Sequence, residues 1–182
     1  MSSFKFHVRD LAYGWCRVVM YIKVKMIVFN ASYLGPNPLA SLIDACVDLI
    51  EEGDDYYIKW QQEQGTLQID MNLDEDKMLH FDIINHNGSD KEPEWHETVP
   101  FEDFVSAIRD EGFRILNAFG LIGYQRSWQS NSDFPLVNLL RITGKFKEIW
   151  KGDSCTTSLK EEIDCLSSNV SKLEISEEKH IR

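Results

Sequence analysis

The sequence lacks the short motifs by which many enzymes and metal proteins are recognised. It contains no G-x-S-x-G, H-E-x-x-H, G-x-G-x-x-G or G-x-x-x-x-G-K-[ST] pattern. Its four cysteines form no C-x-x-C pair and have no zinc-type spacing with histidine. These absences favour a non-catalytic protein over an enzyme, and we expect free thiols, no metal and no cofactor.

Long hydrophobic runs are also missing. The most apolar stretch, residues 18–34, contains Lys23 and Lys25 and is too short and too polar to span a bilayer. Near the N-terminus, Lys5, His7 and Arg9 interrupt any apolar segment of the kind that a secretory signal needs. We therefore expect a cytoplasmic protein that does not bind membranes.

The composition is that of a folded domain. Hydrophobic residues make up 43% and aromatic residues 12% of the 182 residues, which excludes wholesale disorder. A chain of this length suits one domain with a short appendage. We expect a single domain over residues 1–152 and a separate tail over residues 153–182.

Alternating hydrophobic and polar residues predict strands at the start of the chain. Residues 4–11 alternate, and so do residues 15–29, in which the even positions from Cys16 to Val28 are apolar. A period of two over this length indicates one long strand with one buried face.

The remaining patterns predict two clear helices and several more strands. The helices have apolar residues at a 3.6-residue period, and "YLGPNP" and Gly53 frame the first of them. The order β-β-α-β-β-(β)-α-α predicts an α+β fold, with an antiparallel sheet of about five to six strands and helices on one face. The expected elements are helices at 38–53 and 99–120, strands at 56–61, 66–73 and 78–85, a short strand near Trp95, and a third helix at 134–150 in which residues 137–142 could instead be a strand.

The stretch "LQIDMNLDEDKMLHFDI", residues 67–83, has polar residues at every second position. It is not an EF-hand, because Glu75 and Phe81 stand where that loop needs glycine and a bidentate acid. A hairpin explains the pattern better. Only one register buries both apolar faces, and that register places Asp70 opposite Asp82.

The same register brings Asp70, His80 and Asp82 together on the outward face of the hairpin. This cluster could hold a metal ion or act as an acid, as in a metal-dependent enzyme or a small-ligand binder. Alternatively it is a solvated surface, neutralised by Lys23 and Lys25 if their strand lies alongside. The sequence offers no complete ligand set, so we predict no metal site.

Charge is unevenly distributed along the chain. Residues 1–43 contain five basic and one acidic residue, whereas residues 44–103 contain 18 acidic residues and three lysines. An acidic surface of this kind repels nucleic acid and anionic membrane and attracts a basic protein. The loops and turns supply the candidate contact residues Asp54, Asp55, Asp74, Glu75, Asp76 and Trp95.

In size, acidity and α+β architecture the chain resembles bacterial immunity proteins that neutralise toxin domains. The resemblance implies a non-catalytic inhibitor whose acidic surface binds a basic toxin domain. A second alternative is a structural or assembly subunit.

The tail has a possible amphipathic helix. Its apolar residues follow a 4-3-4-3 spacing, and Ser158 with Glu161 forms a capping box. A helix this short is marginal alone, so we predict that it packs on its own domain, with fraying or self-association as alternatives. The protein is then a monomer or a weak homodimer. The spaced residues are Leu159, Ile163, Leu166, Val170 and Leu173.

Overall fold

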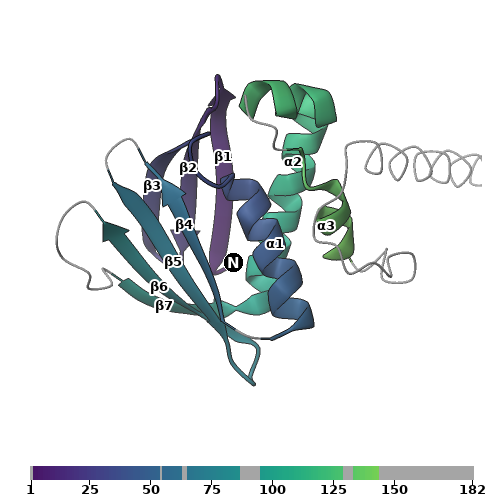
Figure 1. The fold of residues 1–182 in the computed structure, drawn as a ribbon. Coiled ribbons are helices and arrows are strands. Elements are labelled where there is room, and N and C mark those ends of the chain that lie inside the picture. The colour runs from purple at the N-terminus through teal and green to yellow at the C-terminus, as the bar shows by residue number, and fades with distance from the viewer. Residues whose placement is uncertain (1, 54, 63–64, 87–94, 129–132, 144–182) are drawn as a thin grey trace, which may run out of the picture.

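The computed structural model describes residues 2–53, 55–62, 65–86, 95–128 and 133–143. The expected α+β class is confirmed, with the element order β-β-β-α-β-β-β-β-α-α (Figure 1). The described segments contain seven strands in two antiparallel sheets, where we predicted a single sheet of five to six strands. The elements are β1 (Phe4–Ala12), β2 (Trp15–Ile22), β3 (Lys25–Ser32), α1 (Pro38–Glu51), β4 (Tyr56–Gln61), β5 (Thr66–Leu73), β6 (Met78–His86), β7 (Trp95–Pro100), α2 (Phe101–Trp128) and α3 (Leu136–Arg141).

The long strand predicted over residues 15–29 is in fact a hairpin of β2 and β3. The chain turns at Lys23, which has φ 55°, and Ile22 pairs with Lys25. Side chains of paired residues lie on the same face, so the buried positions change from even in β2 to odd in β3. Val24, which continues the apolar alternation in the sequence, is 95% exposed at the tip of the turn.

The second sheet has the strand order β4-β5-β6-β7. The register predicted for its central hairpin is confirmed: Asp70 pairs with Asp82 and Met71 with Phe81. Met71 and Phe81 are buried, as the hydrophobic pattern requires. The short strand expected near Trp95 is present as β7.

The inner faces of the two sheets meet across one hydrophobic core. The ring of Phe4 on β1 stacks on Phe81 of β6 at 5.7 Å, and Phe29 of β3 stacks on Trp60 of β4 at 5.0 Å. The helices α1 and α2 lie together along one side of this pair of sheets (Figure 1), where α2 contacts β1 and α1 contacts β4. The outer faces of the sheets therefore point away from each other and away from the core.

The helix α1 begins at a side chain that also holds α2. Asn37 is its N-cap, and Oδ1 of Asn37 accepts hydrogen bonds from the backbone N–H groups of Leu39 and Ala40. The Asn37 amide donates to the hydroxyl of Tyr124 on α2, and both side chains are buried. One residue thus fixes the start of α1 and its position against α2.

The helix α2 is longer than predicted. We expected an end at residue 120 and a loop afterwards, but helical structure continues to Trp128 beyond a break at Gly120, which has φ 64°. Burial explains the continuation, because Leu121, Tyr124 and Trp128 are all buried. The third helix is confirmed over Leu136–Arg141 only, which also settles residues 137–141 as helix.

The open edge of β1 is covered by two side chains of α2. Glu111 accepts a hydrogen bond from the Val8 N–H at 2.6 Å, and Arg114 donates to the Val8 carbonyl at 2.6 Å. Arg114 also donates to both oxygens of Glu111, which is only 3% exposed. The pair replaces the peptide group of a neighbouring strand, so the strand edge cannot pair with another chain at this point.

Two predictions concern residues outside the described part of the chain. The predicted amphipathic helix of residues 153–182 falls there, and so does the candidate contact Asp54. Among the described helices, none is long and apolar enough to cross a membrane.

Candidate functional site

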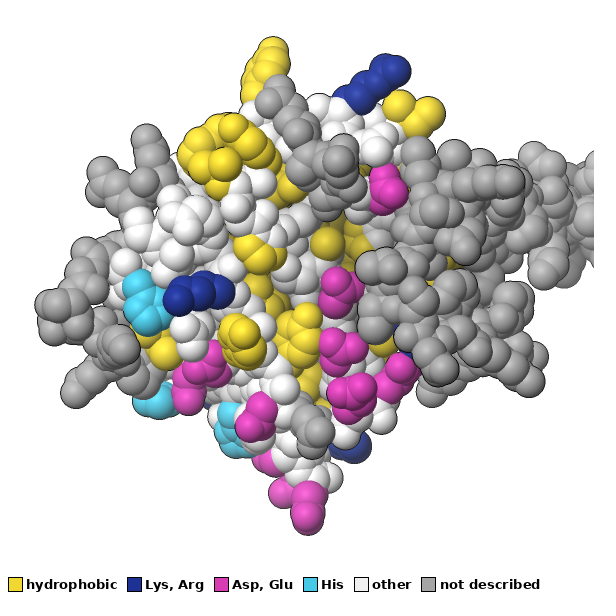
Figure 2. All heavy atoms as spheres, viewed as in Figure 1, with side chains coloured by type: hydrophobic (Ala, Val, Ile, Leu, Met, Phe, Trp, Pro, Cys, Tyr) yellow, Lys and Arg dark blue, Asp and Glu magenta, His cyan; other side chains and the backbone are white. Residues whose placement is uncertain are grey.

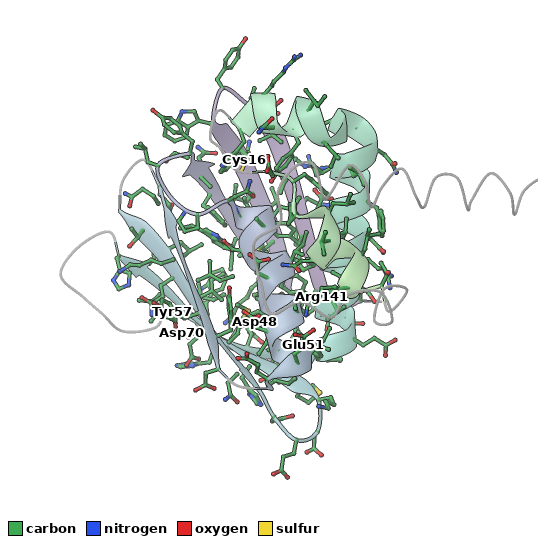
Figure 3. The ribbon with its side chains drawn as sticks, turned by 45° about the vertical axis from the view of Figure 1, so that its right-hand side comes forward. Cys16, Asp48, Glu51, Tyr57, Asp70 and Arg141 are labelled. Carbon is green, nitrogen blue, oxygen red and sulfur yellow. The ribbon has the colours of Figure 1, made fainter. Side chains whose placement is uncertain are left out.

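The outer face of the four-stranded sheet carries a shallow hollow of about 530 Å³. Figure 3 places the labelled Tyr57 and Asp70 on the side of this sheet that faces away from α1. Three neighbouring strands contribute side chains to the hollow. Its lining residues are Asp55, Tyr56, Tyr57, Gln68, Asp70, Met71, Asn72, His80 and Asp82.

Strand register arranges the polar side chains in rows that cross the sheet. One row contains Tyr57, Asp70, Asp82 and His96, each paired with the next across a strand boundary. The next row follows from the same registers, because positions two residues apart share a face. It contains Asn72, His80 and Thr98, with Asp55 beside Asn72 at the start of β4.

Asp70 and Asp82 face each other at the centre of the hollow. The Gln68 amide donates to both oxygens of Asp70, at 2.9 and 3.1 Å. Asp82 is paired with Nδ1 of His96. Two carboxylates directly opposite each other repel, and this repulsion lowers the free energy of unfolding. Fixed hydrogen bonds hold them in place without supplying a permanent positive charge.

His80 is held from two sides at the edge of the hollow. Its Nε2 lies 2.8 Å from Oδ2 of Asp74, and its Nδ1 lies 3.1 Å from the Thr98 hydroxyl. The hydrogen bond from His80, followed by one from the Met78 N–H, lowers the pKa of Asp74 below its usual value. Asp74 is therefore ionised at neutral pH and adds negative charge beside the hollow.

We call this surface the acidic face and define it by Asp55, Tyr57, Asp70, Asp74, His80 and Asp82. Within the described ranges, no lysine or arginine forms an ion pair with its carboxylates. The expected neutralisation by Lys23 and Lys25 is wrong, because both lysines pair with Glu97 at 3.1 Å. Lys59 is the one basic residue of β4, and its side chain lies on the same outer face of the sheet as Tyr57.

The acids of α1 form a second group, seen as a column of carboxylates in Figure 2. Here partial burial and neighbouring side chains reduce the free charge. Arg141 on α3 pairs with Glu51 (Figure 3). Asn138 donates to Asp44 at 2.8 Å. Burial, as the main cause, raises the pKa of both Asp44 and Asp48 above the usual value. This column is less suited than the acidic face to attract a basic partner.

The predicted contact residues lie at two separate places. Asp55 and the turn from Asp74 to Asp76 lie at the same end of the sheet, as expected for an antiparallel arrangement. Trp95 lies toward the opposite end of β6, where it pairs with Ile83. It is half-buried, and Nζ of Lys25 lies 5.4 Å from its ring centre. The rim that we expected to include Trp95 is therefore divided.

The alternative cluster of Asp70, His80 and Asp82 does lie on one face, as the predicted register required. His80, however, binds Asp74 and Thr98, and Asp82 binds His96. In the parts of the chain that the structure covers, no three side chains of His, Cys, Asp or Glu are grouped to hold a metal ion. The side chains of the cluster instead serve as separate hydrogen-bonding partners.

Neither described cysteine is suited to nucleophilic chemistry. Cys16 and Cys46 are free thiols within the core. Burial raises the pKa of the Cys16 thiol to about 12 and raises that of Cys46 well above its usual value. Both side chains therefore stay protonated and pack as small apolar groups.

The sequence does not indicate the contacts of two groups that the structure makes prominent. His96 faces Asp82 because of the register of β7, which no pattern in the sequence specifies. Glu111 binds His7, Val8 and Arg114, although its partners on β1 are about a hundred positions away in the chain. One signal was available for Glu111: it occupies a buried position among the apolar residues of an amphipathic helix.

Comparison with protein-family models, with curated protein sequences and with solved structures finds no significant match.

Proposed function

We propose that this protein is a non-catalytic binding domain whose acidic face docks a basic protein. The observation that carries the proposal is the cross-strand pair of Asp70 and Asp82. A like-charge pair on adjacent strands costs several tenths of a kcal/mol, and no lysine or arginine in the described segments offsets it. A cationic side chain of a partner would relieve that repulsion on binding.

The shape and composition of the hollow support a basic side chain as the group bound. Tyr57 is 72% exposed and is the cross-strand neighbour of Asp70. A guanidinium or ammonium group can lie over its ring while it bonds to the carboxylates beside it. The hollow is open and shallow, which suits one or two side chains of a protein better than an enclosed small ligand.

An anionic partner is disfavoured by the same charges. The net charge of the chain is −11, so nucleic acid and anionic lipid are repelled at long range. A basic protein is steered toward the acidic face, and its association should be fast and sensitive to salt. Within this class we favour a cytoplasmic inhibitor of the immunity type, which would cover the phosphate-binding surface of a basic toxin domain.

The proposal is tested by titrating the protein with a basic probe of known fold, lysozyme, and with a short oligolysine. Asp70→Asn with Asp82→Asn should weaken binding by about twofold to thirtyfold at low salt, the equivalent of two surface ion pairs. The matched control is Glu102→Gln with Asp110→Asn, which removes the same charge from exposed positions on α2. Equal losses in both double variants would show that net charge, and not the acidic face, governs binding.

A further inference from the structure

The outer face of the three-stranded sheet has the opposite chemical character. Strand register arranges it in three rows, and none of its nine residues is acidic. We call this surface the basic face. Its rows are Lys5, Tyr21 and Met26, then His7, Val19 and Val28, then Arg9, Arg17 and Asn30.

The arginines of the basic face repeat the relationship of the two aspartates on the other sheet. Arg9 of β1 is the cross-strand partner of Arg17 of β2, so two like charges lie directly opposite each other. Within the described residues, Lys5, Arg9 and Arg17 form no ion pair. His7 is the member of this face that contacts an acid, at 3.3 Å from Glu111.

Apolar side chains lie beside these cations on the same surface. Met26 is 55%, Val28 39% and Tyr21 37% exposed, although all three stand on strands. Burying them against another surface would be favourable, because apolar area would be removed from water. The basic face thus combines uncompensated positive charge with apolar area that a partner can cover.

We propose that the basic face of one molecule docks on the acidic face of a second copy of the same chain. The two faces have opposite charge, and each has a like-charge pair on adjacent strands. Arg9 and Arg17 can then bond to Asp70 and Asp82, which removes both repulsions at once. The occupant is a second copy because the chain itself carries the complementary surface.

The geometry decides the kind of assembly. The inner faces of the sheets meet in the core, so the outer faces point away from each other. Each contact is then head to tail, which leaves one face of every end molecule free and sets no fixed number of copies. Three strands and three rows span roughly 300 Å², whereas a stable interface covers about 800 Å² on each partner. The association should therefore be weak, because the contact between the two faces must also overcome the long-range repulsion of two chains that each carry −11. The contact between the charged faces should weaken with added salt.

This inference uses the acidic face of the proposed function but needs no outside partner. Self-association and the binding of a basic protein would compete for that face. Substitutions on the basic face separate the two, because Arg9→Ala with Arg17→Ala should weaken self-association and, since it adds no acidic pair, leave oligolysine binding intact. If oligolysine does not bind to the acidic face although the chain self-associates, that result would instead count against the proposed function.

The test is sedimentation equilibrium of the full chain over a range of concentrations, at about 0.01 M and about 0.15 M salt, where the Debye lengths are about 30 and 8 Å. The wild-type mass should rise above 21.2 kDa with concentration at low salt and return toward it at high salt. Arg9→Glu with Arg17→Glu, and separately Asp70→Lys with Asp82→Lys, should each remain at the monomer mass. Mixing these two variants should restore association, because each supplies the surface that the other has lost.

Thermal melts establish that each variant is folded, and the milder pair Arg17→Ala and Asp70→Ala replaces any variant that is not. A wild-type mass that stays at the monomer value at every concentration would overturn the proposal. So would association that survives in both charge-reversed variants alone, or a mixture that stays monomeric when wild type associates. Association of the wild type with a polyglutamate or an oligonucleotide but not with itself would assign the basic face to another partner and reject the second copy.

Discussion

Asp70 on β5 lies directly opposite Asp82 on β6 on the outer face of the sheet. Asp70 accepts from Gln68 and Asp82 pairs with His96, so neither of these side-chain partners is a lysine or an arginine. We expect Asp70→Asn to raise the free energy of unfolding by about 0.2–1 kcal/mol at neutral pH and low salt, because it ends a cross-strand repulsion. Urea unfolding measures the difference. The gain should shrink as salt is added, and Asp110→Asn, an exposed acid on α2, is the control with no comparable gain. An unchanged or lower stability would mean that the hydrogen bonds from Gln68 already outweigh the repulsion.

The buried carboxylate of Glu111 closes the edge of β1. Glu111→Ala should lower the free energy of unfolding by about 1–3 kcal/mol, because it leaves the Val8 N–H without its acceptor and Arg114 without its ion-pair partner. Arg109→Ala removes a partly exposed side chain of the same helix that pairs with the neighbouring Asp110, and it should change the free energy of unfolding by less than about 0.5 kcal/mol. Chemical denaturation of the two variants side by side is the measurement. Similar values for both would remove the structural role assigned to Glu111.

Asn37 links the start of α1 to Tyr124. Asn37→Ala removes the N-cap and leaves the buried Tyr124 hydroxyl without its donor, so we expect a loss of about 1–3 kcal/mol. Asn37→Asp keeps the cap oxygen, and Tyr124→Phe removes only the hydroxyl, so each should cost less than Asn37→Ala. Thermal unfolding of the three variants tests this order. If Asn37→Asp is as damaging as Asn37→Ala, the cap contributes little.

Asp44 gives a pH dependence of defined sign. Burial raises its pKa in the folded state above the unfolded value, so its charged form destabilises the fold at neutral pH. As the pH falls through the raised pKa, the folded state binds the proton first and the penalty is relieved. Asp44→Asn, which can still accept from Asn138, should therefore stabilise the protein at neutral pH, and the difference should shrink in acid. A difference that grows on acidification would contradict this assignment.

The opposite sign applies to Asp74. Its pKa in the folded state is lowered, first by the hydrogen bond from His80, so its stabilising contribution is present above the unfolded pKa. That contribution is lost as the pH falls through the lowered value. Asp74→Asn should thus flatten the acid side of the stability curve, and stability measured at closely spaced acidic pH values would show it. An acid limb identical to that of the wild type would remove Asp74 as a cause.

The sequence predicted those features that depend on which face of a strand or helix is hydrophobic. The register of β5 and β6 followed from the sequence because one arrangement alone buries both Met71 and Phe81. The turn at Lys23 escaped prediction because neither it nor Val24 is a usual turn residue, and the apolar alternation continues through it. The division into two sheets was missed for a different reason: it depends on whether β3 pairs with β4, which no local pattern specifies.

Features that depend on contacts between distant segments could not be predicted from the sequence. Nothing in the residues around His96 specifies the register that brings it to Asp82. Gly120 and the polar residues beyond it are typical of a helix end, yet packing of Tyr124 and Trp128 against the core continues α2. The acidic face was predictable in its Asp70, His80 and Asp82 positions, but the contacts of His80 with Asp74 and of His96 with Asp82 were not.

The most direct test of the acidic face is to map where a basic ligand binds. Backbone amide NMR signals of the full chain are recorded during titration with the short oligolysine at low salt. We expect the largest shifts at Asp55, Tyr57, Asp70, His80 and Asp82, with smaller changes on α2 and on β1 to β3, and we expect Asp70→Asn with Asp82→Asn to reduce them. Shifts centred on Asp44, Asp48 and Glu51 of α1, or spread evenly over all acidic residues, would contradict the assignment of the binding surface.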